Sequence, residues 1–148
     1  MAKNNCILCK LRNEELEVTK IYEDEKICAI MDVRPVNPGH ILVFPSVCVP
    51  LMTELDDEIL SQMMTIARKI NKALRNSGLR CEGVNLLISD GKAAGQEIPH
   101  CHLHLIPRFN RDVFGLRFPD GYPRKTERQE LDDNAEKIKK SLGSLLIE

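Results

Sequence analysis

The stretch His100-Cys101-His102-Leu103-His104-Leu105-Ile106-Pro107 contains three of the four histidines in the chain. Its alternation of imidazole and apolar side chains predicts a β-strand over residues 100–107. Alternate side chains of a strand share one face and lie roughly 6.5–7 Å apart along it. We therefore expect the three histidines to project together from one face, and the apolar residues between them to project into the core.

Such a histidine cluster has three interpretations: a solvated strand face, a three-histidine metal site, or a site for nucleophilic catalysis. Neighbouring histidines of a strand can share a metal ion, but His100 and His104 are too far apart on a flat strand for all three to bind one. In a nucleophilic site a neutral imidazole attacks phosphorus. Its neighbours then orient it and donate hydrogen bonds to the phosphoryl oxygens.

The segment just upstream favours the nucleophilic interpretation. Residues 91–96, Gly-Lys-Ala-Ala-Gly-Gln, form a loop whose small side chains let backbone N–H groups approach a phosphate closely. An ordinary hairpin connection is the alternative for this loop.

Further strands are predicted over residues 18–22, 26–31, 41–44 and 84–89, and residues 34–39, with two prolines and a glycine, form a rigid loop. Apolar residues at three- and four-residue spacing predict a helix over residues 57–76, from the N-cap Asp56 to a stop at Gly78. A charged helix is predicted over residues 127–142. Strands, a helix and further strands indicate an α+β domain built on an antiparallel sheet.

The composition describes one soluble globular domain over residues 1–148, with 43% hydrophobic and 29% charged residues. A net charge of −1 argues against a protein that binds nucleic-acid backbone, although a small nucleotide remains possible. Residues 1–9 contain no secretory h-region, and the longest apolar run, residues 41–44, is too short to cross a bilayer. We therefore expect a cytoplasmic protein without membrane contact, with its six cysteines reduced and with Cys28 and Cys101 in the core.

Taken together, these motifs resemble the histidine triad family of nucleotidyl hydrolases and transferases. The match consists of His-x-His-x-His at residues 100–104, Pro38-Gly39-His40, Gly95-Gln96 and Ile106-Pro107-Arg108, in the family's order. It covers about residues 6–108, which leaves residues 109–148 as a C-terminal extension. The resemblance implies a five-stranded antiparallel sheet, a long helix packed on it, a C-terminal helix, a homodimer and no organic cofactor.

The resemblance also implies roles for individual residues. His102 would attack the α-phosphate of a purine nucleotide, mainly an adenosine nucleotide, and water would hydrolyse the nucleotidyl-histidine to the monophosphate. His40, His100 and His104 would be the other catalytic residues. The nucleotide would be held by Asp32, Ser89, Gly95, Gln96, His102 and His104.

Two of these assignments have structural alternatives. Asp32 suits the ribose hydroxyls because a carboxylate accepts two hydrogen bonds, but it could instead cap the turn before Pro35. His40 could instead be a buried histidine whose hydrogen bonds are satisfied within the fold.

The sequence departs from the family pattern at two positions. Glu97 stands where some relatives have Ser or Thr, and Ser89 stands where many have Asn.

The substrate class stays open at this stage. A nucleoside phosphoramidate and a dinucleoside polyphosphate both fit the implied chemistry. A slow nucleotide-binding or interaction module and a nucleotidyltransferase are the alternatives to a hydrolase.

Cys6 and Cys9 form a CxxC, a common zinc spacing, but a structural zinc site has four ligands. The resemblance implies that Cys48 and His100 complete the set, with Cys48 in place of a more usual His. Four protein ligands leave no position for a catalytic water, so the zinc would be structural and His100 would support His102. The alternative is that Cys6 and Cys9 are reduced thiols on a mobile N-terminus.

Overall fold

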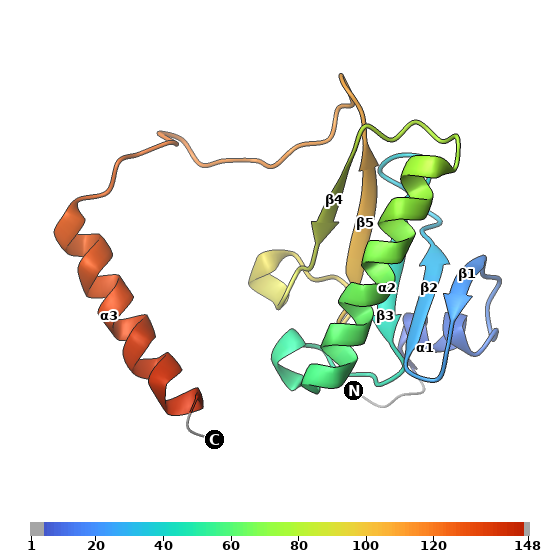
Figure 1. The fold of residues 1–148 in the computed structure, drawn as a ribbon, viewed down its shortest axis with the longest axis horizontal. Coiled ribbons are helices and arrows are strands. Elements are labelled where there is room, and N and C mark those ends of the chain that lie inside the picture. The colour runs from blue at the N-terminus through green and yellow to red at the C-terminus, as the bar shows by residue number, and fades with distance from the viewer. Residues whose placement is uncertain (1–4, 147–148) are drawn as a thin grey trace. The chain divides into compact units, whose positions relative to one another are not determined.

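A computed structural model describes residues 5–146, so the outer ends of the predicted domain, residues 1–4 and 147–148, lie outside the described part. The chain divides after Phe114 into two compact units. The first unit contains the sheet with its two α-helices, and the second contains the helix α3 (Figure 1). That the whole chain is one domain stays a prediction.

The first unit is an α+β structure built on one antiparallel sheet. Its strands are β1 (Lys20–Glu23), β2 (Ile27–Met31), β3 (Ile41–Pro45), β4 (Gly83–Leu87) and β5 (Leu103–Arg108), and its α-helices are α1 (Ile7–Arg12) and α2 (Asp57–Asn76). The strand order is β1-β2-β3-β5-β4, and every neighbouring pair is antiparallel. This confirms the predicted fold class and the five-stranded sheet.

Helix α2 covers one face of the sheet and has the predicted bounds (Figure 1). It begins after Asp56, which makes no side-chain capping bond, and ends before Gly78, whose φ of +82° suits glycine. Its apolar stripe packs on inward residues of β2, β3 and β5. The buried residues of this cluster are Ile27, Ala29, Ile41, Val43, Leu55, Ile59, Met63, Ile66, Ala67, Leu74, Cys101, Leu103 and Leu105. Burying one such large aliphatic side chain contributes about 1.5–3 kcal/mol.

Helix α1 lies against the opposite face, and no helix was predicted there. Alternate residues of β2 and β3 point to this side, so the sheet is buried on both faces over these two strands. The second cluster contains Cys6, Leu8, Cys28, Ile30, Leu42 and Phe44. Cys28 and Cys101 are therefore core residues, as predicted, on opposite faces of the sheet.

Strand β5 begins later than predicted. The ladder with β3 starts at Leu103, opposite Val43, so His100 and His102 precede the strand. The reason is that the backbone N–H of Cys101 donates to the carbonyl oxygen of Val49, outside the sheet, at 2.7 Å. The alternation nevertheless persists, because Cys101, Leu103 and Leu105 all face α2.

The second unit contains α3 (Arg128–Leu145), close to the predicted helix over residues 127–142. None of its described residues is buried, and its apolar side chains Leu131, Ile138, Leu142 and Leu145 are exposed. None of the helices within residues 5–146 combines the length and the apolar character needed to cross a membrane.

Candidate active site

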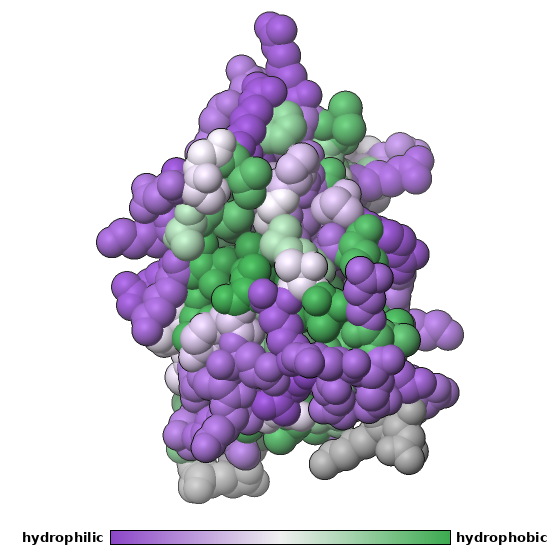
Figure 2. All heavy atoms as spheres, turned by 90° about the vertical axis from the view of Figure 1, so that its right-hand side faces the viewer, coloured by the Kyte–Doolittle hydropathy of each residue, from purple (hydrophilic) through white to green (hydrophobic). Residues whose placement is uncertain are grey.

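A pocket of about 510 Å³ opens on the sheet face that carries α1. Its walls come from α1, residues 16–18, the end of β2 with residues 32–34, and residues 95–98; Leu42, Ser89, His102 and His104 complete it. On the side of the molecule that carries β1, apolar side chains gather between hydrophilic borders (Figure 2). All six predicted nucleotide-binding residues line this pocket, whereas His40 and His100 are not among its lining residues.

His102 is buried, and its orientation is set by the backbone. Its Nδ1 lies 2.6 Å from the carbonyl oxygen of His100. A carbonyl oxygen can only accept, so Nδ1 carries the hydrogen and a neutral ring has its lone pair on Nε2. His102 is therefore a lone-pair donor that lines the pocket, which is what attack on an electrophile requires.

His40 and His104 form a hydrogen-bonded pair beside His102. The backbone N–H of Val36 donates to Nδ1 of His40 at 3.2 Å, so a neutral His40 has its hydrogen on Nε2. That Nε2 lies 2.9 Å from Nδ1 of His104, which must accept. The hydrogen of neutral His104 is therefore on its own Nε2, and His104 is a hydrogen-bond donor in the pocket wall.

Burial keeps this pair neutral at physiological pH. Desolvation, followed by the charges of His102 and His40, lowers the pKa of His104 to about 4. Burial also lowers the pKa of His40, although the carboxylate of Asp32, 3.4 Å from Nδ1, opposes that effect. His40 and His104 are therefore neutral imidazoles with defined donor and acceptor atoms.

Asp32 and Gln96 both make local bonds in addition to lining the pocket. Asp32 Oδ1 accepts the N–H of Arg34 at 2.8 Å, so the turn-capping alternative is part of its role. Gln96 Oε1 accepts the N–H of Gly91 at 3.0 Å, and its Nε2 donates to the carbonyl oxygen of Pro50 at 2.7 Å. Gln96 thus closes the 91–96 loop. Gly91 and Gly95 of that loop have φ values of +96° and +87°, which other residues rarely adopt.

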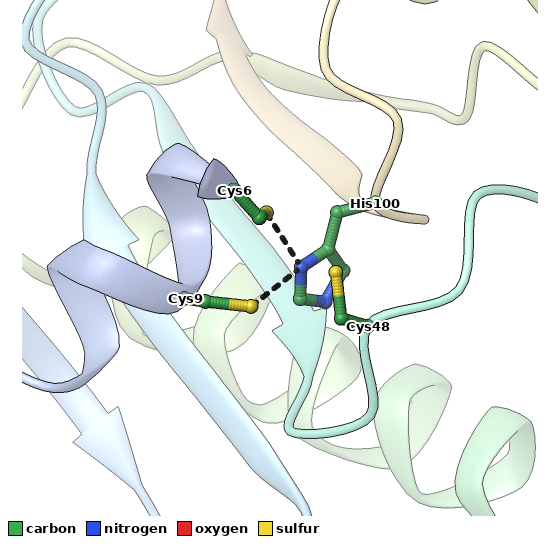
Figure 3. Close-up of side chains that lie close together, drawn as sticks. All are labelled: Cys6, Cys9, Cys48 and His100. Atoms are coloured by element: carbon green, nitrogen blue, oxygen red, sulfur yellow. Dashed lines mark hydrogen bonds between the residues drawn. The ribbon is translucent and has the colours of Figure 1, made fainter. Parts of the chain in front are cut away.

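The four predicted metal ligands meet in one cluster, although they come from distant segments (Figure 3). Their ligand atoms lie within 4.8 Å of one another, and Nδ1 of His100 is 3.3 Å from Sγ of Cys6 and 3.7 Å from Sγ of Cys9. Nε2 of His100 donates to the carbonyl oxygen of Pro45 at 2.9 Å, so the lone pair of Nδ1 faces the thiols. In a tetrahedral zinc site an N and an S ligand atom lie about 3.5–3.6 Å apart, as follows from the zinc bond lengths.

The charges that the thiols would carry when deprotonated also favour a cation bound between them. Burial, together with the neighbouring thiols, raises the pKa of Cys9 to about 12, and burial raises the pKa of Cys48. Thiolates at this position would repel one another unless a cation lay between them. The donor set of three cysteines and one histidine therefore fits a zinc ion.

The sequence analysis missed two contributors to the site, and it gave no role to a third residue that it had named. Ile7, Leu8 and Leu11 of α1 line the pocket, and only the three-residue spacing of the two leucines hinted at a helix. The Val36 amide had no sequence signal, because a backbone donor is set by the loop conformation.

The third is Arg108, whose guanidinium binds Asp112 at 2.5 Å and lowers the pKa of that carboxyl. Asp112 in turn accepts from Asn37 at 3.0 Å, which braces the 34–39 loop before His40.

The fold and the site define a class: α+β proteins with a five-stranded antiparallel sheet and clustered histidines beside a pocket. The model of the HIT domain matches residues 13–111. The chain belongs to the HIT domain family.

Similar proteins support this membership. An uncharacterized HIT-like protein of Borreliella burgdorferi is 38% identical over 115 residues, covering 76% of this chain and 82% of the relative. Adenylylsulfatase HINT3 of Arabidopsis thaliana is 34% identical over 110 residues, covering 74% of this chain and 55% of the relative.

Solved structures share the fold at similar identity. A Zn-bound histidine triad family protein from Mycobacterium smegmatis aligns with a TM-score of 0.73 at 36% identity, covering 87% of this chain and 88% of that one. A histidine triad nucleotide-binding protein from Candida albicans aligns with a TM-score of 0.83 at 27% identity, covering 95% and 99%. The similar proteins thus include an adenylylsulfatase, a Zn-bound histidine triad protein and a histidine triad nucleotide-binding protein.

Proposed function

We propose that this protein hydrolyses a nucleotide at its α-phosphate through a nucleotidyl-histidine on His102. The observation that carries the proposal is the hydrogen bond of 2.6 Å from Nδ1 of His102 to the carbonyl oxygen of His100, which leaves the Nε2 lone pair for phosphorus. The nucleotide-binding relative and the adenylylsulfatase support a nucleotide substrate.

In this mechanism the pocket first binds the nucleoside. The apolar wall of α1 and residues 16–18 takes the base, which we propose is a purine, mainly adenine, and Asp32 accepts from the ribose hydroxyls. Ser89 and the backbone of Gly95 and Gln96 lie on the phosphate side.

The chemistry then takes two displacements at phosphorus. Nε2 of His102 attacks the α-phosphorus, and the bond from phosphorus to the leaving group breaks, with a departing amine taking a proton from solvent. His104 donates from Nε2 to the phosphoryl oxygen that gains charge. Water then attacks the same phosphorus, the bond to His102 breaks, and the nucleoside monophosphate leaves. His40 keeps His104 in the donor tautomer.

The charges around the pocket favour a phosphoramidate over a dinucleoside polyphosphate. The carboxylates in the described pocket wall are those of Glu17, Asp32 and Glu97, against one guanidinium, that of Arg34. A polyphosphate leaving group carries several negative charges that these carboxylates repel, whereas an amine leaving group is neutral or cationic. An adenosine phosphoramidate is therefore the substrate class we propose.

We also propose a structural zinc ion bound by Cys6, Cys9, Cys48 and His100, in line with the zinc-bound relative. It would supply no catalytic water, because four protein ligands fill a tetrahedral site.

A homodimer is a further proposal. Strand β4 is an edge of the sheet with Leu86 and Leu87 exposed, and a second copy could cover it. The cytoplasmic location stays a prediction from the sequence.

Parallel turnover assays with an adenosine phosphoramidate and a diadenosine polyphosphate test this function. We expect faster release of AMP from the phosphoramidate. Equal rates, or a faster polyphosphate reaction, would contradict the substrate assignment. No turnover of either compound, with AMP still bound, would instead favour a nucleotide-binding module.

A further inference from the structure

The cysteine cluster and the pocket share two structural elements. Cys6 and Cys9 lie at the start and in the middle of α1, and the same helix contributes Ile7, Leu8 and Leu11 to the pocket wall. His100 supplies Nδ1 to the cluster, and its carbonyl oxygen orients His102. The cluster drawn in Figure 3 is therefore connected to the apolar wall through α1, and to the carbonyl oxygen that orients His102 through His100.

Helix α1 depends on such anchors because six residues are too few for a helix that is stable alone. Its C-terminal end is held by Arg12, whose guanidinium donates to the carbonyl oxygens of Asp24 and Glu25 at 3.0 and 3.2 Å. Leu8 is fully buried at its centre. The N-terminal end, with the half-exposed Ile7, has the cysteine cluster as its anchor.

We propose that Cys6, Cys9 and Cys48 are positioning residues for the nucleotide site, which act through a bound metal ion on the α1 wall and on His102. This inference rests on the proposed function and deepens it. With the metal bound, α1 keeps Ile7 against the nucleoside and His100 keeps its carbonyl oxygen toward His102. Without the metal, the start of α1 loosens while Leu8 and Arg12 retain the rest of the fold.

Cys48 is the most informative position, because it lies outside α1 and outside the pocket wall. Its side chain also packs on the core cluster that contains Leu8 and Leu42, so a variant that keeps a metal ligand at this position separates the metal's effect from a packing effect. Cys48→Ser removes a good zinc ligand, whereas Cys48→His keeps one. Cys81→Ser is the matched control, since Cys81 is a partly buried thiol that belongs to neither the cluster nor the pocket.

The experiment measures AMP binding by calorimetry and zinc content by metal analysis. Zinc-loaded wild type, chelator-treated wild type and the three variants are compared, with circular dichroism as the check on folding. We expect chelation and Cys48→Ser to weaken AMP binding about tenfold, equivalent to the loss of part of one buried aliphatic contact. Cys48→His and Cys81→Ser should bind AMP like the wild type.

A second variant tests whether the α1 wall of the pocket contributes to AMP binding. Ile7→Ala should weaken AMP binding in the zinc-loaded protein without loss of zinc, and its effect should shrink in the metal-free protein, because the two changes act on the same wall. Nitrogen-15 NMR should show that His102 loses its single Nδ1–H tautomer when the metal is removed, a change that AMP affinity alone would not show.

The outcomes separate the two proposals. If the zinc-loaded wild type does not bind AMP, the proposed function fails. If AMP binds equally well to the loaded, metal-free and Cys48→Ser proteins, the proposed function stands and the positioning role is wrong. Global unfolding on chelation would also overturn that role, because the cluster would then hold the fold and not the pocket.

Discussion

Nε2 of His40 lies 2.9 Å from Nδ1 of His104, while Nδ1 of His40 accepts the backbone N–H of Val36. These two hydrogen bonds fix which ring nitrogen of each histidine donates and which accepts. They make His104 a donor at Nε2, whereas the carbonyl oxygen of His100 makes His102 a lone-pair donor at Nε2. Two neighbouring imidazoles, with ring centroids 4.9 Å apart, thus have opposite chemical roles.

The tautomers of the four histidines form the first prediction. At neutral pH His102 should carry its hydrogen on Nδ1, and His40, His100 and His104 should carry theirs on Nε2, because each assignment follows from a fixed backbone partner or neighbouring ring. Nitrogen-15 chemical shifts of the side chains measure this directly. A His102 ring protonated on Nε2 would remove the proposed nucleophile.

The pH dependence of stability is the second prediction. Burial lowers the pKa of His104 from 6.5 to about 4, so the unfolded chain binds more protons than the folded one between these values. The free energy of unfolding should therefore be at its full value above about pH 6.5 and fall as the pH drops toward about 4. Burial of His40 adds in the same direction. Urea unfolding at several pH values measures this trend.

The control for that trend is His104→Gln, which keeps a polar side chain without this titration. Its stability should depend less on pH over the same range than that of the wild type. An identical acid dependence would show that His104 is not the group responsible.

The third prediction concerns the effect on stability of replacing two adjacent methionines of α2. Met63 is fully buried, whereas Met64 is 43% exposed. Met63→Ala should lower the free energy of unfolding by about 2–5 kcal/mol, because it leaves a cavity. Met64→Ala should change it by no more than about 0.5 kcal/mol. Chemical denaturation compares the two, and similar losses would contradict the packing of α2 on the sheet.

The charge of Glu97 provides the fourth prediction. If carboxylates in the pocket wall repel a polyphosphate leaving group, Glu97→Gln should raise the rate on a diadenosine polyphosphate relative to the phosphoramidate by a few-fold, since one surface charge changes such energies by about 1 kcal/mol. The matched control is Glu58→Gln, which removes a carboxylate on α2 that lies outside the pocket. An unchanged ratio for Glu97→Gln would remove the charge argument.

Much of the fold could be predicted from the sequence, because its main elements have strong periodicity. The apolar spacing in α2 gave its bounds, and alternation gave the core-facing residues of the histidine strand, Cys101, Leu103 and Leu105. The start of β5 was wrong, since the bond from Cys101 to Val49 is a tertiary contact that alternation does not encode. Helix α1 was missed for a similar reason, because a six-residue helix depends on its tertiary anchors more than on its own pattern.

Many of the residues that the structure brings together at the candidate site could be predicted, but the hydrogen bonds between their atoms could not. The resemblance supplied the cysteine and histidine set that the structure brings together, and the pocket residues Asp32 and Gln96. It could not supply the Val36 amide that directs the His40–His104 pair, or the bonds that use both polar atoms of the Gln96 side chain. Those depend on loop conformations set by proline and glycine residues.

Covalent trapping tests the central claim most directly. The wild type and His102→Ala would be mixed with an adenosine phosphoramidate labelled at the α-phosphate, quenched in base and digested, and the labelled peptide identified. We predict label on His102 in the wild type and none in His102→Ala, with AMP still bound by that variant. Turnover by the wild type with label on another residue, or undiminished turnover by His102→Ala, would contradict the account.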